Sequence, residues 1–81
     1  SMITGLQIRA ARSALRWTVE DLANSAGIAG KTVRRIEAID AVPESKLKTI
    51  SQIKSSLEAA GIEFIGTPDD GPGIRIHPPK R

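Results

Sequence analysis

Apolar residues recur at helical spacing along most of the chain, and only its C-terminal part changes to an alternating pattern. The first apolar stripe predicts a helix over about residues 4–15, its members being Ile8, Ala11 and Leu15. Thr18 fits the N-cap of a second helix, because its hydroxyl can accept a hydrogen bond from a free N–H of the first turn. Asp21 supplies the acidic partner of a capping box. We therefore expect a second helix over residues 19–26.

Gly27 separates this helix from a third one. Glycine adopts the positive φ that ends a helix without a steric penalty, so we expect a tight turn there. The third helix is predicted over about residues 30–39, with Val33 and Ile36 on its inner face. Two short helices joined by a glycine turn form a helix-turn-helix pattern.

Pro43 precedes a longer apolar repeat. Proline is favoured in the first turn of a helix, so we predict that a fourth helix covers about residues 44–60. Its inner face is expected to contain residues three or four positions apart, namely Leu47, Ile50, Ile53 and Leu57.

The residues after Gly61 predict a β-hairpin. Residues 62–65 and 74–77 each alternate between apolar and polar side chains, and turn-forming Gly, Pro and Asp fill the segment between them. We expect a single, mainly α domain. A compact helix-turn-helix unit of four to five helices covers residues 1–61, and a β-hairpin with a basic tail covers residues 62–81 of the same domain.

Composition and charge narrow the range of functions. The chain has 12 Lys and Arg residues against 9 Asp and Glu residues, a formal net charge of +3, and no Cys. The absence of Cys excludes disulfides and thiolate metal sites. No apolar run approaches the roughly 18 residues of a membrane span, and we find neither a paired-carboxylate nor a Ser–His–Asp arrangement. We expect a cytoplasmic protein that is not an enzyme, needs no metal or cofactor, and has no membrane partner.

The third predicted helix has a basic face. At about 100° per residue, its cations lie opposite the apolar positions. Arg and Lys side chains can donate hydrogen bonds to guanine in the major groove or to phosphate. This pattern favours binding to double-stranded DNA rather than a merely solvated basic face, and the predicted contact residues are Lys31, Thr32, Arg34, Arg35, Thr18 and Arg16.

Residues Ile8 to Ala38, IRAARSALRWTVEDLANSAGIAGKTVRRIEA, resemble the Xre/Cro family of lambda-repressor-like helix-turn-helix regulators. The resemblance implies a domain of about five helices that binds operator DNA, usually as a dimer, and regulates transcription as a repressor or autoregulator. Several members pair an Arg of the first helix with a Glu late in the third. Arg12 and Glu37 stand at those positions, which implies a structural ion pair.

Three positions depart from the family pattern. Val19 stands where a Gln usually contacts phosphate, Ala29 where Ser or Thr often caps the third helix, and Gly30 where a side chain often contacts bases. Two alternatives stay open, and the departures support the second of them. One is an antitoxin-type regulator that also binds a toxin through its C-terminal part, and the other is a protein-interaction module that keeps the scaffold without binding DNA.

Two roles are compatible with the predicted hairpin. It can cover the helical core, or it can offer a strand edge that pairs with the same edge of a second copy. We favour the second role, and therefore expect a homodimer.

Overall fold

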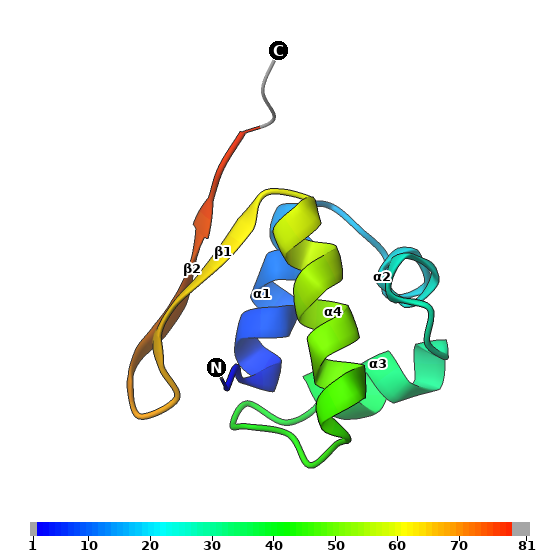
Figure 1. The fold of residues 1–81 in the computed structure, drawn as a ribbon, viewed down its shortest axis with the longest axis horizontal. Coiled ribbons are helices and arrows are strands. Elements are labelled where there is room, and N and C mark those ends of the chain that lie inside the picture. Colours follow the sequence, from blue (N-terminus) through cyan, green and yellow to red (C-terminus); the bar gives the residue numbers. More distant parts are fainter. Residues whose placement is uncertain (1, 79–81) are drawn as a thin grey trace.

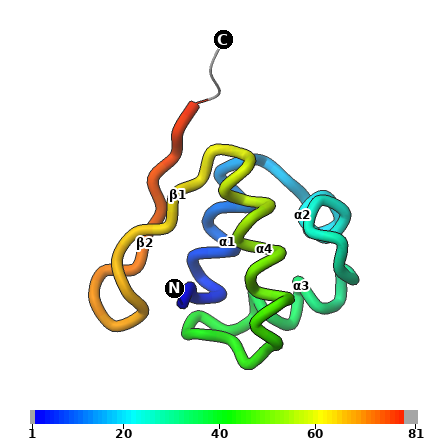
Figure 2. Tube along the Cα trace, viewed as in Figure 1, coloured from blue at the N-terminus to red at the C-terminus, as the bar shows by residue number. Residues whose placement is uncertain are grey.

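The computed structural model describes residues 2–78, which form four helices followed by an antiparallel hairpin (Figures 1 and 2). The elements are α1 (Gly5–Ala14), α2 (Val19–Ala26), α3 (Gly30–Glu37), α4 (Leu47–Ala59), β1 (Ile62–Thr67) and β2 (Asp70–Ile76). This mainly helical fold with a C-terminal hairpin was expected from the sequence. The predicted basic tail falls largely on residues 79–81, outside the described residues. Within residues 2–78, no helix is both long enough and apolar enough to cross a membrane.

One apolar core joins all four helices to the first strand. The side chains buried in it include Ile8, Ala11, Leu22, Val33, Ile36, Ile53, Leu57 and Ile62. Burial of an aliphatic side chain of this size stabilises a fold by about 1.5–3 kcal/mol. The core therefore fixes the positions of α2 and α3 relative to the other two helices, because α3 packs against α1 and α2 packs against α4.

The start of α4 differs from the prediction. The helix begins at Leu47 rather than near residue 44, and Pro43 is buried in the connection after α3 instead of in the first turn of α4. Leu47 was expected on the inner face, but it is 89% exposed. The first turn of α4 extends beyond the core, so only the later members of the stripe, Ile53 and Leu57, are fully buried. The third helix also ends earlier than predicted, at Glu37 rather than near residue 39.

The two strands are longer than the sequence indicated and contain a bulge. Ile62 pairs with Ile76 and Phe64 with Ile74, and the register then shifts beyond Ile65. Gly66 has a φ of +73° at this shift, and an added Cβ there would lie 2.1 Å from the carbonyl oxygen of Gly71. Only glycine fits this turn of the hairpin.

Gln7 attaches the hairpin to the start of α1. Its Nε2 donates to the carbonyl oxygens of Gly73 at 2.9 Å and Ile65 at 3.2 Å, while its Oε1 accepts from the backbone N–H of Thr4 at 2.8 Å. Phe64 and Ile74, which pair across the hairpin, pack against the helical core. The hairpin therefore covers part of the core, which is one of the two roles expected for it.

Candidate nucleic-acid interface

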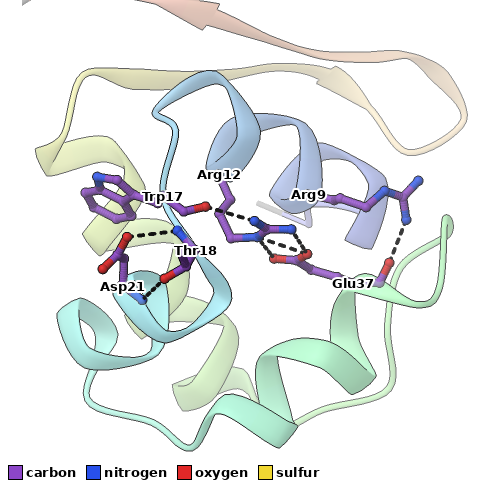
Figure 3. Close-up of polar contacts among 6 residues, drawn as sticks. All are labelled: Arg9, Arg12, Trp17, Thr18, Asp21 and Glu37. Atoms are coloured by element: carbon purple, nitrogen blue, oxygen red, sulfur yellow. Dashed lines mark hydrogen bonds and ion pairs between the residues drawn. The ribbon is translucent and has the colours of Figure 1, made fainter.

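A capping box starts α2, as the sequence predicted. Thr18 Oγ1 accepts from the backbone N–H of Asp21 at 3.0 Å, and Asp21 Oδ2 accepts from the backbone N–H of Thr18 at 2.8 Å (Figure 3). The helix ends at Gly27, which has a φ of +72°. An added Cβ at Gly27 would meet nothing within 4 Å, so the backbone conformation, not a lack of space, selects glycine.

The helix after this turn has one buried face and one exposed face. Val33 and Ile36 are fully buried, and they pack into the core beside Leu22 and Ala23 of α2. In Figure 1, α2 is seen end-on while α3 is seen from the side, so the two helices cross steeply. The outer face of α3 is formed by exposed residues, which are Lys31, Arg34, Arg35 and Ala38. We call this exposed set the basic face of α3.

Arg34 forms an ion pair with Glu20 of α2, which sequence reasoning missed. Both side chains are exposed. The pair lies over the first turn of α3, because an added Cβ at Gly30 would lie 3.4 Å from Arg34 Nη1 and 3.5 Å from Glu20 Oε2. The N-terminus of a helix attracts anions. In this structure a carboxylate of the protein itself occupies that region.

Arg35 is held against the connection between α3 and α4. Its Nη1 donates to the carbonyl oxygen of Glu44 at 2.8 Å, and its Nη2 lies 3.5 Å from Ser45 Oγ. A guanidinium has five N–H donors. Arg35 therefore keeps donors for a further acceptor while its side chain is restrained.

Lys31 is the most available cation of the basic face. Its side chain is exposed, and it makes no hydrogen bond or ion pair with any other side chain or backbone group of the described segment 2–78. Its neighbour Thr32 is half-buried. Ala29, which precedes the helix, provides no side-chain cap, so the first turn of α3 relies on backbone contacts.

Arg16 and Thr18 lie just before α2. Arg16 is exposed and has a φ of +59°, and no other non-glycine residue of the described chain has a positive φ. A side chain in this left-handed region costs free energy that glycine would avoid. Thr18 Oγ1 accepts a hydrogen bond in the capping box, which leaves its O–H free to donate to another group.

Arg12, which is partly buried, and Glu37, which is buried, form an ion pair on the inner side of α3 (Figure 3). Arg12 Nε donates to Glu37 Oε2 at 2.8 Å and its Nη2 donates to Oε1 at 2.9 Å. Arg12 Nη1 also donates to the carbonyl oxygen of Trp17 at 2.9 Å. The hydrogen bond to Glu37 is the main reason why the pKa of Arg12 is raised above its ordinary value.

Arg9 reinforces the same junction. Its Nη1 donates to the carbonyl oxygen of Glu37 at 2.7 Å, and its Nη2 pairs with Asp40 Oδ1 at 3.0 Å. The end of α3 is therefore fixed to α1 by two arginines. This attachment sets the angle at which the basic face projects.

The six predicted contact residues thus come from α3, from the start of α2 and from the loop before it. Neither a comparison with protein-family models nor a comparison with curated proteins finds a match for this chain.

Proposed function

We propose that this protein is a sequence-specific regulator of transcription of the lambda-repressor-like type, a repressor or autoregulator that binds double-stranded DNA. In this proposal α3 enters the major groove and α2 lies across the phosphate backbone. The main support for DNA binding is that α3 has two distinct faces: its apolar face is buried in the core, and its basic face is exposed to solvent. A rigid helix with exposed cations can enter a groove without rearranging the fold.

Each contact residue has a role that follows from its surroundings. Lys31 is free to bind a base edge or a phosphate, and Arg35 offers its remaining donors from a restrained position. Thr18 and Arg16 are suited to phosphate oxygens, Thr18 through its O–H and Arg16 through its charge. Arg34 is paired with Glu20, so it can contact DNA in two ways. Either it leaves Glu20, or the two side chains stay paired beside the DNA.

The experiment is a selection of bound sequences from random duplexes, followed by fluorescence anisotropy on the selected site at two salt concentrations. We expect affinity to fall steeply with salt, since phosphate neutralisation releases counterions. Lys31→Ala and Arg35→Ala should each weaken binding by about 1–3 kcal/mol if they read bases. Lys54→Gln on α4 removes the same charge away from α3 and serves as the matched control.

A protein-interaction module without DNA binding is the second candidate, and one observation favours it. Two of the three cations of the basic face already contact other parts of the chain, Arg34 at Glu20 and Arg35 at Glu44. The same titration separates the candidates. If no duplex binds even at low salt, DNA recognition is refuted and the interaction module is the better account.

A further inference from the structure

Three hollows lie in a row on the surface formed by the end of α3, the connection to α4 and the start of α4. The first two share Val42, Pro43 and Glu44, and the second and third share Leu47 and Ile50. Because neighbouring hollows share residues, they form one continuous groove, which we call the α3–α4 groove. The residues that line its two ends are Arg35 and Lys54.

The α3–α4 groove gathers exposed apolar side chains. Five large apolar residues of the described segment 2–78 are exposed, and three of them line this groove, namely Met2 at 64%, Ile39 at 47% and Leu47 at 89%. Single exposed apolar residues are ordinary on a protein surface, but a contiguous set with a polar rim is typical of an interaction site. Leu47 adds little to the core, so its side chain is available to a partner.

The walls of the groove are held in place. Arg35 Nη1 donates to the carbonyl oxygen of Glu44 at 2.8 Å, and the backbone N–H of Gly5 donates to the carbonyl oxygen of Ala41 at 3.0 Å. Pro43, between these two attachments, is buried. A surface that is already ordered loses little conformational entropy when a partner binds.

Cations surround the groove. Arg35 and Lys54 line its ends, while Lys46 and Lys48 are exposed and flank the first residue of α4, about 100° to either side on the helix. Against these four cations, the lining contains one acid, Glu44. The rim is therefore positive around an apolar floor, and the complementary partner has acidic residues beside apolar ones.

Two other occupants fit this surface less well. A second copy placed about a two-fold axis would bring two positive rims together, which is unfavourable. Asp40 cannot compensate for them, because it is already paired with Arg9 at 3.0 Å. The phosphates of DNA would suit the cations, but they would leave Met2 and Leu47 exposed to solvent.

We propose that the α3–α4 groove binds a short amphipathic helix of another protein. Apolar side chains of that helix enter the hollows, and its Asp and Glu residues pair with the cations of the rim. This adds a protein partner to the proposed binding of DNA and does not depend on it.

The shape of the groove favours a helix. Leu47, Ile50 and Lys54 lie on one face of α4 over about 10 Å, and a bound helix presents its anchors at i, i+3 or i+4, and i+7 over the same length. The lining contains no strand edge, so an extended segment would find few partners for its backbone, whereas a helix satisfies its own. The hollows, of about 350, 200 and 260 Å³, are at or below the lower limit of small-molecule sites, about 300–1,000 Å³. A row of such hollows suits successive side chains.

The experiment uses the full chain without DNA, because Arg35 belongs both to this groove and to the basic face of α3. Random peptides of about 16 residues, long enough for a short helix, are displayed on phage and selected on the immobilised protein. We expect enriched peptides to carry apolar residues three or four positions apart and an excess of Asp and Glu. The most enriched peptide is then synthesised with a fluorescent label, and its affinity is measured by anisotropy.

Two variants with matched controls locate the peptide. Leu47→Asp should weaken binding about tenfold or more, since it removes a central anchor, and Asp is favourable in the first turn of a helix. Ile76→Asp makes the same change at the end of β2, which lies at the opposite end of the molecule (Figure 1), and should have little effect. Lys48→Glu should weaken binding about threefold or more, and by less at high salt. Lys31→Glu changes the net charge equally and should have little effect.

Four outcomes overturn the proposal. The first is a selection that enriches no peptide, and the second is a set of binders that are basic or insensitive to Leu47→Asp. The third is a dimer of the free protein that Leu47→Asp dissociates, since a second copy would then cover the groove. The fourth is Lys48→Glu weakening the binding of duplex DNA but not that of the peptide, which would assign the rim to phosphate. A protein that binds the peptide as expected but binds no duplex refutes the proposed function and leaves this inference standing. Circular dichroism confirms that each variant is folded before affinities are compared.

Discussion

Arg12 and Glu37 meet through two parallel hydrogen bonds, at 2.8 Å and 2.9 Å, on the side of α3 that faces α1. Glu37 is 5% exposed, and Arg12 also reaches the carbonyl oxygen of Trp17, just before α2. One guanidinium therefore connects α1, the end of α3 and the entry to α2. The geometry of the basic face depends on a pair of side chains that are not part of it.

Breaking this pair from one side should be costly. Glu37→Leu leaves the partly buried charge of Arg12 without a partner, and we expect a loss of about 3–5 kcal/mol in the free energy of unfolding. Urea denaturation measures it. The double variant Arg12→Met with Glu37→Leu removes both charges and should recover much of the loss. If the effects of the two single changes simply add, the pair is not coupled and this account of it is wrong.

Features that depend on local chemistry could be predicted from the sequence. The Thr18 capping box, the turn at Gly27 and the inward faces of α2 and α3 each follow from a few neighbouring residues. The pairing of Arg12 with Glu37 came from a family resemblance, and the structure brings the two side chains together.

Features that depend on how elements meet in space could not be predicted. Periodicity assigned Leu47 to an inner face, but it cannot tell where a helix extends beyond the core. The pairing of Arg34 with Glu20 depends on the crossing of α2 and α3. Gln7 is an ordinary polar residue in the sequence, and its contacts with the hairpin arise from residues more than fifty positions away.

Glu20 should lower the affinity of the protein for DNA. Its carboxylate neutralises Arg34 and lies near the start of α3, where a phosphate would otherwise be favoured. We expect Glu20→Gln to tighten binding to the selected duplex by about three- to tenfold at low salt, and by less at high salt because the charges are exposed. Fluorescence anisotropy measures both. Glu58→Gln on α4 changes the net charge equally and should have a much smaller effect. Weaker binding by Glu20→Gln would mean that Glu20 positions Arg34 for DNA.

Gly5 should tolerate no larger residue. An added Cβ would lie 1.9 Å from the carbonyl oxygen of Ile39 and 2.3 Å from that of Ile36, and both are backbone atoms that cannot rotate away. We expect Gly5→Ala to lower the free energy of unfolding by about 1–3 kcal/mol or more, because α1 and the end of α3 must separate. Thermal unfolding followed by circular dichroism measures the loss. An unchanged melting temperature would show that the two helices are less closely packed than the structure indicates.

Substitutions of Arg16 should change the free energy of unfolding and the affinity for DNA in opposite directions. Its φ of +59° is unfavourable for a side chain and favourable for glycine, so Arg16→Gly should raise the free energy of unfolding by up to about 1 kcal/mol. If Arg16 contacts phosphate, the same variant should bind DNA more weakly and with a smaller salt dependence. Arg16→Lys keeps the charge and the strain, and should bind almost as well as the original protein. Arg16→Asn tolerates the left-handed conformation and should resemble the glycine variant in both measurements. A glycine variant that is more stable and binds DNA equally well would remove Arg16 from the contact set, because neither its conformation nor its charge would then serve recognition.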